Sequence, residues 1–288
     1  MNSVSSRDSR RREAGLKVLS VTSGKGGVGK TNIVANLAYA LSERGLRVLV
    51  LDADLGLGNI DVLLGLNPLY TLHDVLRGDA TLEEVLISGP GGMRILPAPS
   101  GQVELTNLSE ADRLRFLSAI DELEEEVDVF LIDTGAGIAS NVCFFNMAAQ
   151  DVYVVTNPEP TALTDAYALI KVMSREYGEK SFKLIVNEVS GEREAISIFS
   201  HLTAVCDRFL NIRLELAGFV PVDAKLTRAV RDQQLVAERY PEAISSRCIR
   251  EVALAIERSP TAMFPKGNIQ FFWRRLWAPD ATAQAPVV

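Results

Sequence analysis

The chain of 288 residues is long enough for one large α/β domain or two small ones. With 47% hydrophobic and 23% charged residues it has a globular composition, and its net charge of −7 argues against general coating of nucleic acid. No run of about 18 apolar residues predicts a membrane-spanning helix. The cysteines at 143, 206 and 248 lie far apart, which fits a reduced, cytoplasmic protein without disulfides or a metal cluster.

Short β-branched apolar runs alternate along the chain with longer stretches of helical spacing. Strands are predicted over residues 18–22, 48–51, 93–96, 127–132, 152–156, 183–189 and 216–220, and helices over 30–44, 110–126, 161–176, 192–209 and 241–258. Strands that are apolar on both sides need cover on both faces of their sheet. The sequence therefore predicts a single doubly wound α/β domain, with a mostly parallel sheet between two layers of helices.

A glycine-rich loop that fits the phosphate-binding pattern G-x-x-x-x-G-K-[ST] follows the first predicted strand. It consists of Gly24, Lys25, Gly26, Gly27, Val28, Gly29, Lys30 and Thr31. Glycines let backbone N–H groups turn onto phosphate oxygens, and the following helix adds the positive end of its dipole. We expect Lys30 to reach the β- and γ-phosphates of a nucleotide and Thr31 to place its hydroxyl on Mg²⁺.

Two acidic positions follow predicted strands. Asp54 comes after the second strand, where its carboxylate is placed to orient an attacking water and contact Mg²⁺; the alternative is that Asp52 and Asp54 only end a strand and begin a turn. Asp133 ends the apolar strand that precedes residues 134–138, and the pattern predicts a magnesium ligand. Residues 134–138 are predicted to form a flexible switch loop that senses the γ-phosphate.

Lys25 is a second lysine within the phosphate loop, and two cations so close together favour an anion between or beside them. The run SGKGGVGKT at residues 23–31 resembles the deviant Walker A signature of the MinD/ParA family of ATPases. The resemblance implies a P-loop fold, ATP and Mg²⁺ as ligands, hydrolysis involving Lys25, Lys30 and Asp54, and a homodimer in which Lys25 reaches the partner's ATP. The alternative is a solvated loop lysine.

The resemblance covers about residues 18–277 and is greatest to the FlhG/FleN branch, whose members regulate flagellar number and placement. It is carried by Asn32 and by residues 156–167, and it implies that Asn32, Asn187, Pro221, Val222 and Asp223 join the loop in holding the nucleotide. Partners implied are an FlhF-type GTPase, a flagellar switch component or a transcription factor, whereas DNA is not expected. Residues 1–15 lack the short segment with which FlhG-type proteins stimulate FlhF.

The segment KGNIQFFWRRLW at residues 266–277 forms one apolar stripe if it is helical. The stripe contains Ile269, Phe272, Trp273, Leu276 and Trp277. The resemblance favours a helix that binds anionic lipids of the inner membrane; the alternative is a helix packed on the domain.

The predicted organisation has four parts: a mobile Ser/Arg-rich arm (1–15), an ATPase domain (16–260), a membrane-targeting helix (264–278) and a disordered tail (279–288). The leading hypothesis is an ATPase that dimerises with ATP, binds the cytoplasmic face of the membrane and regulates flagella. Three alternatives are kept: a MinD-like regulator of the division site, a ParA-like ATPase that positions DNA or cargo, and a nucleotide-gated scaffold with negligible turnover.

Overall fold

The computed structural model describes residues 16–55, 58–98, 109–121 and 127–260. Its strands are β1 (Lys17–Ser23), β2 (Val48–Ala53), β3 (Ile87–Ser88), β4 (Arg94–Leu96), β5 (Val129–Ala136), β6 (Asp151–Thr156), β7 (Ser181–Val189) and β8 (Arg213–Pro221). Its helices are α2 (Lys30–Glu43), α3 (Ile60–Leu64), α4 (Leu72–Arg77), α5 (Leu82–Val85), α6 (Glu110–Asp121), α7 (Ser140–Met147), α8 (Pro160–Glu176), α9 (Glu192–Phe209), α10 (Ala224–Arg231), α11 (Val236–Arg239) and α12 (Ile244–Arg258), with a short 3₁₀ turn at Pro90–Gly92.

The strands form one sheet in the order β3-β4-β2-β5-β1-β6-β7-β8, in which β3 alone is antiparallel to its neighbour. The two central strands β1 and β5 are in a register that places Val21 opposite Asp133. The next pairing, between β2 and β5, places Asp52 opposite Asp133. Because parallel strands end at one edge of a sheet, the phosphate loop after β1 and the acidic residues of β2 and β5 lie together.

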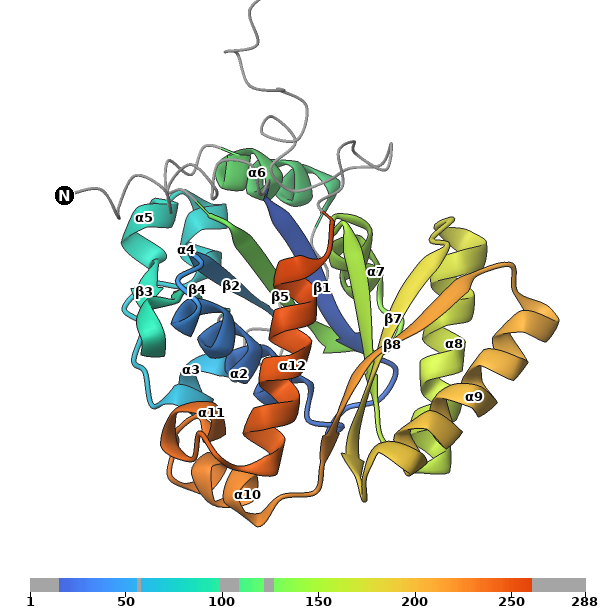
Figure 1. Cartoon of the computed structure of the whole chain (residues 1–288). Helices are drawn as coiled ribbons and strands as arrows, with labels where there is room; N and C mark the ends of the chain where they lie inside the picture. The colour runs from blue at the N-terminus through green and yellow to red at the C-terminus, as the bar shows by residue number, and fades with distance from the viewer. Residues whose placement is uncertain (1–15, 56–57, 99–108, 122–126, 261–288) are drawn as a thin grey trace, which may run out of the picture.

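Helices cover both faces of the sheet, as Figure 1 shows. On one face α2 and α12 pack side by side, and Leu37, Leu41 and Ile249 belong to the core that they bury. On the other face α4 to α9 enclose two further clusters; the rings of Phe116 on α6 and Phe145 on α7 meet edge to face, 6.1 Å apart. The structure confirms the predicted doubly wound, mostly parallel architecture.

The boundaries differ from the predictions in several places. The predicted loop at residues 134–138 is wrong in part, because Thr134, Gly135 and Ala136 continue β5. Thr134 pairs with Ala53 at the end of β2, and Ala136 pairs with Ser23 at the end of β1, which extends the strand beyond its apolar run. The strand β8 is longer than the strand predicted at residues 216–220, and the helix α12 begins at Ile244 rather than at residue 241. The antiparallel strand β3 and the helices α3, α4, α5, α7, α10 and α11 were not predicted.

The predictions for residues 1–15, 264–278 and 279–288, and for the end of the helix at 122–126, lie outside the described residues. Within the described residues, none of the helices has the length and hydropathy needed to cross a bilayer.

Candidate functional site

The phosphate loop joins the end of β1 to the start of α2. Gly27 and Gly29 have φ values of 81° and 84°, a left-handed conformation that is costly for residues with a Cβ. Gly24 is required by packing, because a Cβ there would lie 2.1 Å from the main-chain carbon of Asp165 on α8. The first turn of α2 contains no acidic residue, so its positive dipole end is available to an anion. The loop therefore has the backbone of a phosphate cradle.

Lys30 and Asp133 form a buried ion pair beneath this loop. The Nζ of Lys30 lies 2.5 Å from Oδ1 of Asp133, and the side chains are 8% and 1% exposed. Burial raises the pKa of Asp133, whereas Lys30 and a side-chain hydrogen bond with Thr31 act in the opposite direction. The second carboxylate oxygen, Oδ2, is buried without a hydrogen-bond partner among the described residues. A buried carboxylate oxygen next to a threonine hydroxyl is suited to Mg²⁺ or to a water bound to it.

The loop after β2 is held by Asp52, which lies beside Asp133 in the sheet. Its Oδ2 accepts hydrogen bonds from the backbone N–H groups of Asn59 and Ile60 at 2.9 and 3.1 Å, and its Oδ1 accepts one from Asp54 at 3.1 Å. Burial, followed by the charge of Asp133, raises the pKa of Asp52 to about 7 despite these three bonds. Asp52 thus fixes both the start of α3 and the backbone that presents Asp54.

Asp54 extends toward the end of β5. Its Oδ1 lies 3.6 Å from the position that a Cβ on Gly135 would take, and its charge contributes to raising the pKa of Asp133. The two predicted metal-binding carboxylates and Thr31 are therefore gathered around the end of the phosphate loop.

Lys25 points away from Lys30 toward the start of α8. Its ammonium forms an ion pair with Glu159 and donates a hydrogen bond to the hydroxyl of Thr161 at 2.9 Å. Glu159 is 58% exposed and Lys25 37% exposed, so this contact is at the surface. An exposed ion pair contributes little stability, and Lys25 can exchange it for another anion at small cost.

A pocket of about 280 Å³ lies on the other side of the loop. Its lining contains Asn187, Pro221, Val222 and Asp223, which were predicted to hold the base. Gly29 of the phosphate loop and Asn32, both predicted to bind the nucleotide, also line it, with Glu188, Leu226 and Ile249 among the others. The Nδ2 of Asn187 donates to the main-chain oxygen of Val28 at 2.8 Å, which ties the loop to the end of β7. The adjacent Glu188 has a φ of 57° and accepts a hydrogen bond from Asn157. Strain of this kind in a residue other than glycine is often found at binding sites.

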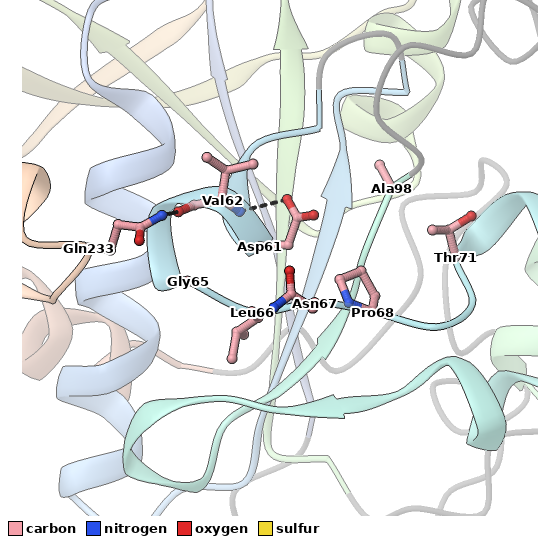
Figure 2. Close-up of a pocket in the computed structure, with 9 residues that line it drawn as sticks. All are labelled: Asp61, Val62, Gly65, Leu66, Asn67, Pro68, Thr71, Ala98 and Gln233. Carbon is pink, nitrogen blue, oxygen red and sulfur yellow. Dashed lines mark hydrogen bonds between the residues drawn. The ribbon is translucent and has the colours of Figure 1, made fainter.

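A second pocket, of about 490 Å³, lies beside α3 (Figure 2). Asp61 and Val62 on α3, residues 65–68, Thr71, Ala98 and Gln233 line it. Gln233 bridges to α3 from the segment after α10, because its Nε2 donates to the main-chain oxygen of Val62 at 2.7 Å. This pocket was not predicted, since its walls come from three separate parts of the chain.

Sequence reasoning predicted the phosphate loop, the carboxylates and the base site, and the structure brings these residues together at one edge of the sheet; their roles stay predictions. It missed Glu159 and Thr161, the partners of Lys25, and it gave Asp52 only a strand-ending role. The backbone groups that donate to Asp52 lie two to eight positions later in the chain. The short separation in sequence between Asp52 and Asn59 was therefore a signal from which this turn could have been predicted.

Comparisons with known proteins agree with this geometry. The family model described as the CobQ/CobB/MinD/ParA nucleotide binding domain matches residues 19–236. The antiactivator FleN of Pseudomonas aeruginosa is 43% identical over 270 residues, covering 94% of this chain and 96% of FleN. The flagellum site-determining protein YlxH of Helicobacter pylori is 34% identical, covering 90% and 89% of the two chains.

Among solved structures, the septum site-determining protein MinD of Pyrococcus horikoshii, determined as a complex with Mg-ADP, superimposes with a TM-score of 0.68. It is 28% identical and the match covers 84% of this chain and 96% of MinD. The phosphate loop, the buried Lys30–Asp133 pair and these matches lead to one conclusion. The chain belongs to the MinD/ParA family of nucleotide-binding proteins and is an ATPase of the deviant Walker A type.

Proposed function

We propose that this ATPase is a switch that dimerises with ATP, attaches to the cytoplasmic face of the inner membrane, and regulates the number or placement of flagella. The observation that supports the switch most strongly is the pairing of a buried Lys30 with Asp133 under a loop whose other lysine, Lys25, stays at the surface. The names of the Pseudomonas and Helicobacter relatives support the flagellar assignment, and the word antiactivator favours a transcription factor as the client.

In this proposal the β- and γ-phosphates of ATP lie in the loop from Gly24 to Thr31, with the backbone N–H groups and Lys30 neutralising their charge. The hydroxyl of Thr31 and the carboxylates of Asp133 and Asp54 would hold Mg²⁺, directly or through water. The buried Oδ2 of Asp133, which lacks a partner among the described residues, fits that role. When bound, Mg²⁺ supplies charge that stabilises the phosphoryl group being transferred.

The base occupies the pocket of about 280 Å³ between Asn187 and Pro221. The side-chain oxygen of Asn187 and the main-chain carbonyl of Val222 are suited to accept hydrogen bonds from the amino group of adenine, while Ile249 and Leu226 supply apolar surface. Asp54 orients the attacking water for in-line transfer, a task that needs a carboxylate held in place rather than a nucleophile. The hydrogen bonds of Asp52 provide that rigidity.

The dimer rests on Lys25. Its exposed contacts with Glu159 and Thr161 are made within one subunit, and a partner's phosphate offers a stronger, charge-assisted alternative. We expect Lys25→Ala to bind ATP but to remain monomeric with a non-hydrolysable analogue, as measured by light scattering. Glu159→Gln is the matched control, because it removes the same ion pair and keeps the lysine, so it should dimerise at least as well as the wild type. An unchanged dimer fraction in Lys25→Ala would refute the cross-subunit role.

Membrane attachment rests on the apolar stripe of Ile269, Phe272, Trp273, Leu276 and Trp277. One stripe of this size binds weakly, comparable to a single lipid anchor that needs a second signal. A dimer carries two, and the second insertion becomes intramolecular, which raises the overall affinity by about 10² to 10⁴. ATP thus controls attachment to the membrane, because the dimer that forms with ATP carries two stripes and the monomer carries one.

A further inference from the structure

The short helix α3 is held at both of its ends by side chains from other parts of the chain. At its start, Oδ2 of Asp52 accepts hydrogen bonds from the backbone N–H groups of Asn59 and Ile60. At its end, the Nε2 of Gln233 donates to the main-chain oxygen of Val62 at 2.7 Å, as Figure 2 shows. A helix of five residues is not stable by itself, so these contacts fix its position together with its two buried side chains.

Gln233 makes this bond from a strained backbone conformation. Its φ of 51° lies in the left-handed region, and among the described residues only Gln233 and Glu188 adopt a positive φ without being glycine. Such strain persists where the surrounding structure holds the residue in place. A Cβ on Gly65, the residue that ends α3, would lie 3.5 Å from the side-chain oxygen of Gln233. The side chain of Gln233 therefore packs against the turn at the end of α3.

The helix α10 lies between Gln233 and the base pocket. Asp223 caps the first turn of α10, and Leu226 and Thr227 line the pocket. Gln233 follows the other end of the helix, where its own N–H group donates to the main-chain oxygen of Val230 at 3.1 Å. One short helix thus joins the base pocket to the contact with α3.

Few side chains hold α10 in place. Of its eight described residues only Ala229 is buried, and an element with so little buried surface has low local stability. A base that packs against the side chains of α10 in the pocket adds contacts to this helix and restricts its motion. Because Gln233 joins α10 to α3, this restriction extends to α3 and, through Asp52, to the backbone that presents Asp54.

We propose that Gln233 is a positioning residue for hydrolysis, which transmits occupation of the base pocket to Asp54 through α3. The inference rests on the proposed roles of Asp54 and of the base pocket, and it names the contact that connects them. A nucleotide whose base fills the pocket then holds the water-orienting carboxylate more firmly than a triphosphate without a base does. Hydrolysis at saturation is therefore faster when the base is present.

The test compares single-turnover phosphate release from ATP and from ribose 5′-triphosphate by the full-length protein, each extrapolated to saturation in the presence of Mg²⁺. Gln233→Glu keeps the length of the side chain and replaces its donor by a carboxylate that cannot donate to Val62, so it should slow ATP hydrolysis about three- to tenfold. Its rate with ribose 5′-triphosphate and its affinity for a non-hydrolysable ATP analogue should remain at the wild-type values. Gln234→Glu is the matched control, because it makes the same substitution at the next exposed residue, and it should hydrolyse both triphosphates like the wild type.

Gln233→Gly separates positioning from stability. Glycine relieves the strain at this position but removes the donor, so this variant should unfold at a higher urea concentration than Gln233→Glu and yet hydrolyse ATP as slowly. ATP hydrolysis by Gln233→Glu or Gln233→Gly at the wild-type rate would overturn the proposal. An equal loss with ATP and with ribose 5′-triphosphate would also overturn it, because Gln233 would then hold α3 irrespective of the base.

Failure of the proposed function gives different results. If Asp54→Ala hydrolyses ATP at the wild-type rate, Asp54 does not orient the water. If Asn187→Ala leaves the affinity for ATP unchanged, the base lies outside the pocket. If both of these variants are defective and the Gln233 variants hydrolyse both triphosphates like the wild type, the proposed site stands and only the coupling through Gln233 is wrong.

Discussion

The ammonium of Lys30 lies 2.5 Å from Oδ1 of Asp133, and both side chains are buried. This places one cation between two anionic groups: the carboxylate on one side and, in the proposed complex, the phosphates of ATP on the other. The pair ties the phosphate loop directly to β5. Removing either partner should therefore affect both folding and nucleotide binding.

Lys30→Ala should lower ATP affinity by at least about a hundredfold, because it removes a charge-assisted contact to the phosphates. It should also lower the free energy of unfolding by about 3–5 kcal/mol, since Asp133 is left buried without its cation. Lys30→Met/Asp133→Asn, which neutralises both partners, should regain most of the stability and none of the ATP affinity. Urea unfolding and titration calorimetry check the two effects, and ATP affinity at the wild-type value in Lys30→Ala would place the nucleotide elsewhere.

Two glycines of the phosphate loop should respond differently to alanine. At Gly24 a Cβ would lie 2.2 Å from the main-chain oxygen of Asp165, so loop and α8 must separate; we expect a loss of about 2–4 kcal/mol in the free energy of unfolding. At Gly26 nothing lies within 4 Å of such a Cβ, and stability should change by no more than about 0.5 kcal/mol. Equal unfolding midpoints for the two variants would show that the packing of the loop against α8 is misplaced.

Asp54→Ala should keep ATP affinity and ATP-dependent dimerisation while slowing hydrolysis by at least about a hundredfold, because it removes the group that positions the water. Asp79→Ala, which removes a carboxylate that is 60% exposed and paired with Arg77, is the control and should hydrolyse ATP normally. Phosphate release in a single turnover measures both. Turnover by Asp54→Ala at the wild-type rate would show that Asp54 takes no part in hydrolysis.

The pH dependence of folding should reveal Asp52. With nucleotide absent and divalent ions chelated, its pKa is about 7 in the folded chain, mainly through burial, against about 4 when unfolded. Between these values the folded state binds more protons than the unfolded state, so the free energy of unfolding falls as pH rises from about 4 to about 7. The full shift corresponds to about 4 kcal/mol. Asp52→Asn should flatten this dependence in urea titrations at several pH values; an equally steep dependence in that variant would assign the protons to another group.

The parts of the site that sequence revealed are contiguous in the chain. The phosphate loop can be recognised because its glycines and Lys30 follow a strand and begin a helix. Asp133 can be recognised because an apolar strand precedes it. The fold followed from the same alternation of strands and helices. The strand β3 has two residues and no pattern of its own, since its pairing with β4 depends on tertiary contact.

Other features join residues that lie far apart in the sequence, and these could not be predicted. The contact of Lys25 with Glu159 joins residues 134 positions apart, and the hydrogen bond of Lys17 with Ser259 joins residues 242 apart. Residues 134–138 were predicted as a loop after the apolar run, yet Thr134 pairs with Ala53 of β2 and Ala136 with Ser23 of β1. Such pairings follow from strand register, which the sequence of a single segment does not contain.

The most direct test of the switch is sedimentation of the full-length protein with anionic vesicles in saturating ATP analogue and in saturating ADP, with the chain lacking residues 266–288 measured beside it. Avidity from two stripes on one dimer predicts binding at least about a hundredfold tighter with the ATP analogue than with ADP, and none by the truncated chain although it still dimerises. Trp273→Glu, which places a charge in the stripe, should behave like the truncation. Equal sedimentation of the full-length protein in the two nucleotide states would contradict the account.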